Sequence, residues 1–273
     1  MSMSKKSKAL LYTLLTIVAV YFLAPFIYML FTTFKTEAEA IAYPPKLFPE
    51  VWRLSNFADA WGAQDFGRYF INSMLVTLGT TAGQIISCSL VAYGFARYEF
   101  KGKNILFMIL LSTMMIPWDV TMIPQYMEFK MFGWINTLKP LIIPAWFGSA
   151  YYVFLMRQFL MGIPKDFEEA ARIDGANPFQ IYYKIFMPIL KPQLILVGVL
   201  NMITVWNDYL GPLIFLQDRS KFTLALGLAS FKGVHSTQII PMLCITVIMI
   251  IPPILVFIVA QKYIVEGTSG SIK

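Results

Sequence analysis

Long stretches without a charged side chain dominate the hydrophobic pattern of this chain. Residues 9–34, 69–96 and 237–261 contain no Asp, Glu, Lys or Arg. A helix needs about 20 apolar residues to cross a hydrocarbon layer of ~30 Å, and each stretch is longer than that. The pattern therefore predicts three transmembrane helices.

Three further apolar segments, 104–126, 140–163 and 192–217, each carry one charged residue, which is Asp119, Arg157 and Asp208 respectively. A charge at mid-membrane costs ~2.5–3.5 kcal/mol on insertion scales, so such residues usually face a cavity or a partner. Counting these segments as spans predicts an all-α polytopic membrane protein with six transmembrane helices. The expected spans are about 9–34, 69–96, 104–127, 140–163, 188–217 and 237–262.

The positive charges predict the topology. Lys5, Lys6 and Lys8 precede a first apolar run longer than the 7–15 residues of a signal peptide, so we expect a retained first helix. With residues 1–8 in the cytoplasm, most of the 22 Lys and Arg residues fall on the cytoplasmic side. The positive-inside rule then favours cytoplasmic N- and C-termini over the reverse orientation. Residues 9–273 form one transmembrane domain in this interpretation, with a folded external loop at 35–68 that contains a short helix.

Composition agrees with a membrane protein and excludes other classes. The 273 residues are 58% hydrophobic and 14% charged, which exceeds ordinary soluble composition. The net charge of +7 is dispersed at span ends, so we expect no nucleic-acid partner. Cys88 and Cys244 fall inside predicted helices as apolar residues. His235 has no metal-ligand neighbours and reads as a solvated loop residue, so we expect no metal site.

Residues 164–184, which we call the elbow, combine several local helix signals. Asp166 and Glu169 have the spacing of an acidic capping box, and Gly175 can end a helix in the left-handed conformation. The predicted helix, Phe167 to Asp174, is about two turns long, so packing must hold it. Asn177, followed by a proline and by Gln180, predicts the cap of a second helix.

The first elbow helix presents two faces. The i, i+3, i+4, i+7 spacing places four residues on one face, and Glu168 and Arg172 share another. The residues on the first face are Phe167, Ala170, Ala171 and Asp174. Small alanines allow close approach by a second surface, which favours a docking element. A connector lying on lipid headgroups would instead have a basic face, and this helix is locally acidic.

The elbow carries a specific resemblance. Its sequence Glu169-Ala170-Ala171, then Asp174-Gly175-Ala176, then Phe179 and Pro188, resembles the "EAA" loop of ATP-binding-cassette (ABC) importer permeases. The likeness runs from about residue 10 to the C-terminus. Segments that resemble the carbohydrate-uptake branch, in particular the maltose-type permease of the G kind, are 72–73, 92–97, 115–124, 154–159 and 206–212.

This resemblance implies a fold, partners and residue roles. It implies the type I ABC importer permease fold, in which the elbow helix sits in a cleft of a cytoplasmic ATPase. Glu169 would engage the ATPase, Gly175 would make the turn and Asp174 would brace it. The implied coupling residues are Phe167, Glu168, Glu169, Ala170, Ala171, Arg172, Asp174, Gly175 and Ala176.

The implied partners are a second homologous permease, an ABC ATPase homodimer, an extracytoplasmic sugar-binding protein and membrane lipid. ATP and Mg would be bound by the ATPase, with no cofactor on this chain. A phosphate loop needs Gly-x-x-x-x-Gly-Lys-Ser/Thr, whereas Gly102-Lys103 is followed by Asn104 and lacks the earlier glycine. We therefore expect a permease subunit in a bacterial or archaeal cytoplasmic membrane that is not itself an enzyme.

Candidate pathway residues lie in the third and fifth predicted spans. An aromatic ring beside Asn and Asp suits a sugar, whose ring has apolar faces and hydroxyl edges. Such residues also form interfacial belts or pair across helices, and both interpretations stay open. The candidates are Asp119, Trp206, Asn207, Asp208 and Tyr209.

The main alternative function is an ion-gradient-driven secondary transporter. That class favours two related halves with matching broken helices, and the sequence has no such repeat. A membrane-embedded enzyme is a third class, but the sequence lacks a plausible catalytic set. The sequence does not decide which sugar or polyol would be carried, although a disaccharide or oligosaccharide fits the resemblance.

Overall fold

The structure is a computed structural model that describes residues 4–233 and 237–269. His235 lies outside the described residues. The described chain is helical, apart from an isolated β-bridge between Lys232 and Thr237. Its internal contacts divide it into two compact units, Met1–Phe66 with Gly227–Ile251, and Gly67–Leu226 with Pro252–Lys273. Each unit is described separately.

The first unit contains α1 (Lys5–Thr32), α2 (Glu37–Ala40), α3 (Ser55–Gly62) and the first part of α15 (Ile239–Ser269). The segment after α1 is folded, as predicted. Asn56 at the start of α3 donates hydrogen bonds to the carbonyls of Thr33 (2.8 Å) and Lys35 (2.9 Å). The short helix expected between residues 35 and 68 is therefore present as α3.

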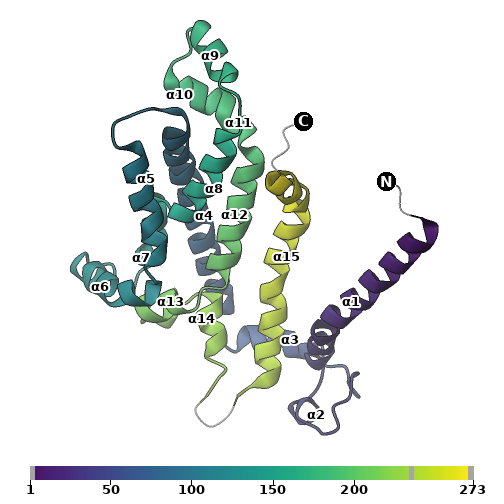
Figure 1. Cartoon of the computed structure of the whole chain (residues 1–273). Helices are drawn as coiled ribbons and strands as arrows, with labels where there is room; N and C mark the ends of the chain where they lie inside the picture. Colours follow the sequence, from purple (N-terminus) through teal and green to yellow (C-terminus); the bar gives the residue numbers. More distant parts are fainter. Residues whose placement is uncertain (1–3, 234–236, 270–273) are drawn as a thin grey trace. The chain divides into compact units, whose positions relative to one another are not determined.

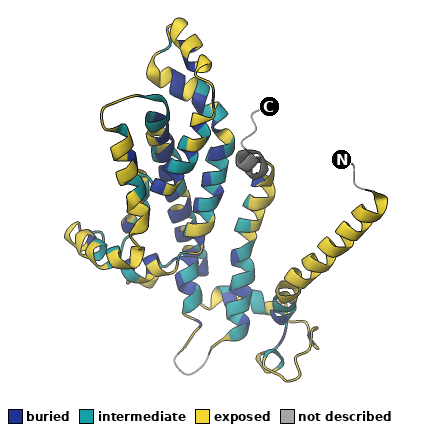
Figure 2. Cartoon of the chain, viewed as in Figure 1, coloured by how far each residue is buried: buried dark blue, intermediate teal, exposed yellow. Residues whose placement is uncertain are grey.

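The second unit is built around a helix bundle (Figure 1). Its main helices are α4 (Phe66–Arg97), α5 (Lys103–Ser112), α8 (Ala150–Met161) and α12 (Lys191–Trp206). Figure 2 shows buried residues concentrated where these helices face one another. Buried Asn201 of α12 joins α4 by donating to the hydroxyls of Thr81 (2.9 Å) and Thr80 (3.3 Å), a polar contact of the kind that links membrane helices.

Shorter elements close the two ends of this bundle (Figure 1). The elbow end carries α9 and α10, and the opposite end carries α6, α7 and α13. These shorter elements are η1 (Thr113–Met115), α6 (Trp118–Met131), α7 (Lys139–Ile142), η2 (Ile143–Phe147), α9 (Asp166–Ile173), α10 (Pro178–Ile181), the π-helix η3 (Tyr182–Phe186), α11 (Met187–Ile189), α13 (Leu210–Phe215), η4 (Arg219–Lys221) and α14 (Leu224–Ala229).

Three of the described helices are long and apolar enough to cross a membrane: α1, α4 and residues Ile239–Tyr263 of α15. Two bent helix pairs raise the number of candidate spans to five if each pair counts as one span. The three uncharged runs, residues 9–34, 69–96 and 237–261, thus coincide with these three long helices.

The segment 104–127, expected to be one span, is broken. Ile116 is extended (φ −85°, ψ 112°), and Lys103–Met115 meets α6 at an angle of 97°. The cause is Pro117, because a proline disfavours the helical conformation of the residue before it. Asp119 therefore does not lie 15 residues deep in a straight helix but in the first turn of α6, where it is exposed.

The segments 140–163 and 188–217 are also discontinuous. In the first, Gly148 (φ +84°) separates η2 from α8, whose 12 residues extend about 18 Å. In the second, α12 ends at Trp206 and α13 begins at Leu210. The pair Pro178–Ile189 and Lys191–Trp206 bends by 73°. Asp208 lies at the break between α12 and α13, whereas Arg157 lies inside α8.

Two glycines of α4 provide a matched test of the packing against η2. A Cβ on Gly83 would lie 2.7 Å from Cδ1 of Trp146, whereas a Cβ on Gly94 would meet nothing within 4 Å. Alanine favours a helix over glycine by about 1 kcal/mol at either position. We expect Gly94→Ala to be neutral or stabilising, and Gly83→Ala to be about 1–3 kcal/mol less stable than Gly94→Ala through overpacking. Thermal unfolding of the purified protein in detergent measures the difference, and equal midpoints would contradict the close approach of Trp146 to Gly83.

Candidate functional site

The first helix of the elbow ends as the sequence predicts. The C-cap residue of α9 is Asp174, and the next residue, Gly175, has a left-handed backbone conformation with φ +79°. The amide of Ala176 donates to the carbonyl of Ala171 (3.0 Å), and the amide of Gly175 donates to that of Arg172 (3.1 Å). This pair of bonds is the Schellman motif, whose left-handed residue is usually glycine.

The beginning of α9 differs from the prediction. Lys165 is the N-cap residue and makes no side-chain cap bond, and Asp166 is the first helical residue. The expected Asp166–Glu169 capping box is therefore wrong, because the helix starts one residue earlier than that motif requires. The acidic first turn of Asp166, Glu168 and Glu169 still complements the positive end of the helix dipole.

The second helix of the elbow begins with the predicted cap. The backbone amide of Gln180 donates to Oδ1 of Asn177, and the backbone amide of Asn177 donates to Oε1 of Gln180, both at 2.9 Å. Pro178 occupies the first helical position. The backbone groups at the end of α9 and at the start of α10 thus have local hydrogen-bond partners, and these bonds fix the turn between the two helices.

The two faces of α9 divide differently from the predicted ones. Glu168 and Ala171 are buried, whereas Phe167 is 50% exposed, and Glu169, Ala170 and Asp174 are also exposed. Ala171 thus leaves the predicted face and packs in the bundle core, beside residues such as Ile181 and Phe186. Of the predicted docking face, Phe167, Ala170 and Asp174 are exposed, and Glu169 is exposed on another side of α9.

Glu168 faces the bundle as part of an ion pair. Its Oε1 lies 2.5 Å from Nη2 of Arg172, and its side chain is 8% exposed against 58% for Arg172. The Arg97 guanidinium is a second positive charge that interacts with this carboxylate. A largely buried carboxylate needs such partners, so Glu168 holds α9 on the bundle.

Arg97, the last residue of α4, connects three segments beneath the elbow. Its Nη2 donates to the carbonyl of Ile163 at 2.9 Å, just before α9. Its guanidinium also lies over the ring of Phe186, 4.6 Å from the centroid, at the end of η3. Its position at the end of a long apolar helix marks it as a helix-end anchor, but its contact with Ile163, 66 residues away, could not be predicted from the sequence.

Tyr182 makes a further link between the elbow and α4. Its hydroxyl lies 2.8 Å from Oγ of Ser89, and its ring lies 5.3 Å from that of Tyr93. The phenol therefore serves as a packing and hydrogen-bonding group between η3 and α4.

A cavity of 660 Å³ lies at the opposite end of the bundle and contains three of the five predicted pathway residues, Asn207, Asp208 and Tyr209. Asp208 accepts a hydrogen bond from the Gly211 amide (3.1 Å), and Asn207 donates to the Ile203 carbonyl (2.8 Å). We call this the Asn207 cavity. Its lining residues are Trp118, Gln125, Pro140, Leu141, Pro144, Thr204, Asn207, Asp208, Tyr209, Leu210, Gly211 and Phe215.

The other two predicted pathway residues do not line the Asn207 cavity. Trp206 is 2% exposed, and its ring packs edge-on against Phe70 of α4 (5.8 Å between centroids). Asp119 lies on α6 beside Trp118 but outside the lining. Trp118 and Gln125 were missed by sequence reasoning, because only the bend at Pro117 brings α6 across this end of the bundle.

Neither location has the residues of a metal centre. In the part of the chain that the structure describes, no group of three or more His, Cys, Asp or Glu residues could hold a metal ion. The two locations are an exposed short helix at one end of the bundle and a cavity with polar residues at the other.

Residues 79–269 match the family model described as "Binding-protein-dependent transport system inner membrane component". The chain belongs to this family. The permease is accordingly a transport component of an ABC importer and not a catalytic enzyme, and the resemblance predicted from its sequence is confirmed.

Several relatives of the permease match nearly its whole length. The melibiose/raffinose/stachyose import permease protein MelC of Bacillus subtilis is 34% identical over 275 residues, covering 98% of each chain. The arabinooligosaccharides transport system permease protein AraQ of Bacillus subtilis is 32% identical, covering 92% of this chain and 91% of its own. The diacetylchitobiose uptake system permease protein NgcG of Streptomyces coelicolor is 28% identical, covering 98% and 89%.

A solved structure supports the same family. A chain of a bacterial ABC transporter involved in the import of the acidic polysaccharide alginate superposes with a TM-score of 0.83 at 25% identity, covering 97% of the permease and 99% of that chain. The fold is therefore that of an ABC importer permease.

Arg97 provides a test of how the elbow is held. We expect Arg97→Met to remove the bond to the Ile163 carbonyl and one of the charges that stabilise buried Glu168, a loss of about 1–3 kcal/mol. Amide hydrogen exchange in residues 163–176 should then quicken by roughly tenfold or more. Lys101→Met, which removes an exposed charge from the same inter-helix loop, is the control and should leave this exchange unchanged. Equal exchange in the two variants would contradict the role of Arg97.

Proposed function

We propose that this permease carries a sugar, a disaccharide or an oligosaccharide, into the cell and that a partner ATPase drives it through the elbow. The names of relatives that match over nine-tenths or more of the permease refer to diacetylchitobiose, arabinooligosaccharides and melibiose/raffinose/stachyose. These ligands share the sugar-ring chemistry that the Asn207 cavity suits.

The exposed face of α9 carries the proposal. A two-turn helix is unstable by itself in water, yet α9 is held by a Schellman motif, the Glu168–Arg172 ion pair and Arg97 while Phe167, Glu169, Ala170 and Asp174 remain exposed. An apolar ring, a small alanine and two carboxylates on a rigid helix suit insertion into a cleft of another protein. In our proposal that protein is a cytoplasmic ABC ATPase homodimer, which binds ATP and Mg.

The coupling residues divide into two groups in this mechanism. Glu169 engages the ATPase, and Gly175 and Ala176 form the turn that seats the elbow. Glu168, Ala171 and Arg172 fix α9 to the bundle. When the ATPase dimer closes, displacement of α9 is passed to α4 through Arg97 and switches the direction in which the cavity opens.

The proposed assembly spans the cytoplasmic membrane of a bacterium or archaeon. Six spans with both termini in the cytoplasm place the elbow inside and the Asn207 cavity toward the outside. A second homologous permease completes the translocation pathway, and an extracytoplasmic sugar-binding protein delivers the substrate. The Lys and Arg distribution supports this orientation.

The Asn207 cavity supplies suitable contacts for a sugar. Asn207 and Asp208 provide polar groups for hydroxyls, and the ring of Tyr209 provides an apolar surface for C–H faces. Trp206 supports these residues from the bundle side by packing on Phe70. Asp119 does not line this cavity, so it serves as the control position in the uptake experiment below.

Two substitutions test the elbow. We expect Glu169→Lys to lose ATP-dependent uptake, because it reverses the charge at the docking face. Gly175→Pro should also lose it, because proline fixes φ near −65° whereas Gly175 has φ +79°. The measurements are co-purification of the ATPase with the tagged permease and uptake of labelled oligosaccharide into proteoliposomes.

The control for this experiment is Glu99→Lys, a charge reversal outside the elbow at an exposed residue. Its side chain is 83% exposed, so assembly and uptake should stay at the wild-type level. If both elbow variants assemble and transport as the wild type does, the docking proposal is wrong.

The sugar contacts have a separate test. Asn207→Ala and Asp208→Ala should each raise the concentration for half-maximal uptake by about tenfold, which corresponds to one lost hydrogen bond of about 1.4 kcal/mol. Asp119→Ala, which removes a carboxylate outside the cavity lining, should leave that concentration unchanged. A wild-type concentration dependence in both cavity variants, with normal ATPase assembly, would remove these residues from the pathway.

A further inference from the structure

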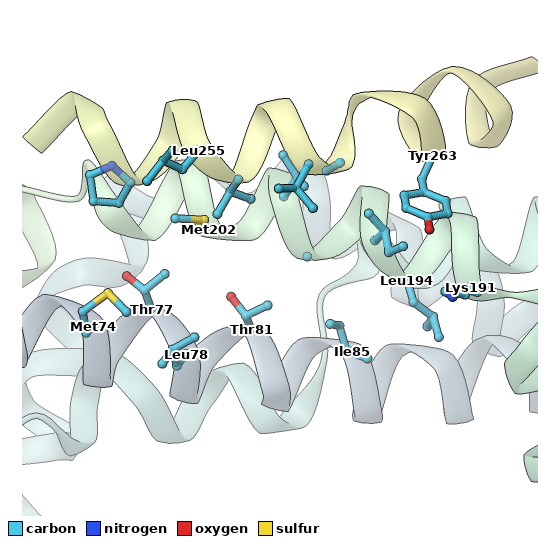
Figure 3. A pocket seen from close by; sticks show the side chains of 17 residues that line it. Met74, Thr77, Leu78, Thr81, Ile85, Lys191, Leu194, Met202, Leu255 and Tyr263 are labelled. Carbon is cyan, nitrogen blue, oxygen red and sulfur yellow. The ribbon is translucent and has the colours of Figure 1, made fainter.

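A second, larger hollow lies along the side of the bundle in the second unit. It has a volume of 820 Å³ and is bordered by α4, α12 and the part of α15 that begins at Pro252 (Figure 3). We call this the lateral groove. Its lining residues are Met74, Thr77, Leu78, Thr81, Ile85, Lys191, Leu194, Ile195, Gly198, Val199, Met202, Pro252, Leu255, Val256, Val259, Ala260 and Tyr263.

The lateral groove has the length of one bilayer leaflet. Along α4 its lining extends from Met74 to Ile85, and along α15 from Pro252 to Tyr263. Eleven helical steps give about 17 Å, close to half of a ~30 Å hydrocarbon core. Between its ends the lining is apolar apart from the Thr77 and Thr81 hydroxyls, and Thr81 accepts a hydrogen bond from Asn201 (2.9 Å).

The polarity of the lateral groove is concentrated at one end. Figure 3 shows Lys191 and Tyr263 together at one end and Met74 at the other. The Nζ of Lys191 lies 5.7 Å from the centroid of the Tyr263 ring, and the Nζ of Lys262 lies 4.7 Å from the same ring. Among the described residues that line the groove, none is Asp or Glu. The groove is therefore an apolar channel with a positively charged mouth.

We propose that the lateral groove is a binding site for an anionic phospholipid, with an acyl chain along α4 and α12 and the phosphate beside Lys191. An amphiphile with one apolar length and one anionic end matches this charge distribution, whereas an apolar helix of another subunit needs no cation at one end. Tyrosine is a residue of the membrane–water interface, and lysines between transmembrane helices bind anionic headgroups. In the proposed orientation, this phosphate lies in the cytoplasmic leaflet, because Lys191 begins α12 at the end of the bundle that carries the elbow.

Gly198 provides a way to close the lateral groove without disturbing the headgroup end. A Cβ on Gly198 would lie 3.5 Å from Ile85 Cδ1 and 3.7 Å from Thr81 Cγ2, which is ordinary contact. The helix therefore accepts a side chain here, and Gly198→Leu fills part of the space that an acyl chain would use. Lys191→Gln removes the charge of the lysine that lines the mouth while keeping a side chain of similar length, and Lys262, which does not line the groove, is left in place.

The experiment uses the full-length permease in its assembled importer, placed in nanodiscs. Phosphatidylglycerol or phosphatidylcholine with a photoreactive group near the end of one acyl chain is added at trace level, and cross-linked peptides are quantified by mass spectrometry. We expect phosphatidylglycerol to label residues 74–85, 194–202 and 252–260 about fivefold more than phosphatidylcholine does, since one lysine contributes ~1 kcal/mol toward an anionic lipid. Lys191→Gln should abolish that preference, and Gly198→Leu should reduce labelling by both lipids.

Lys103→Gln is the matched control, because Lys103 pairs with Glu99 (3.0 Å) and lies outside the lateral groove. It should retain the fivefold preference. Equal labelling by the two lipids in the wild type, or an unchanged preference in Lys191→Gln, would overturn the proposal. So would cross-linking of the groove to another subunit in place of lipid, which would identify the occupant as protein. Lipid labelling is scored without transport, so its outcome is independent of the proposed sugar uptake.

Discussion

One arginine at the end of α4 holds the elbow in place, and the proposed coupling depends on it. Arg97 donates to the carbonyl of Ile163 before α9 and lies over Phe186 after α10. One cation therefore contacts a carbonyl at the base of the elbow and a ring after its second helix, and its charge also favours the nearby carboxylate of Glu168. These contacts fix α9 and α10, neither of which would be stable by itself in water, to the end of the long helix α4.

This arrangement also explains why the elbow separates its acidic residues. Glu168 is turned inward and paired with Arg172, whereas Glu169, its neighbour along the chain, is exposed. Adjacent helical positions point about 100° apart, so one residue can anchor the helix while the next remains available to a partner. Exposed Ala170 and buried Ala171 divide in the same way.

The sequence predicted features that depend on a few neighbouring residues. The Asn177–Gln180 cap and the left-handed Gly175 follow from local hydrogen bonding and from the absence of a Cβ, and both are present. Asp166 failed as a cap because helix boundaries shift by a residue when tertiary contacts decide where the chain enters the helix. The burial of Glu168 could not be predicted, because it depends on which side of α9 packs against the bundle, and residues far away in the sequence decide that.

The Asn207 cavity was predictable only in part, for the same reason. Asn207, Asp208 and Tyr209 are consecutive, so local sequence reasoning found them together, but Trp118 and Gln125 reach the cavity only through a corner in the chain. Pro117 explains the extended backbone of Ile116, yet the place where α6 then lies depends on contacts such as the packing of Phe129 on Phe215.

That corner between α5 and α6 has a mechanical consequence. Ile116 is held extended by the proline that follows it, and Pro117 has no amide with which to rejoin the preceding helix. The corner therefore cannot be straightened into one continuous helix without displacing Pro117. It keeps α6 across the end of the bundle, where Trp118 and Gln125 form one side of the Asn207 cavity.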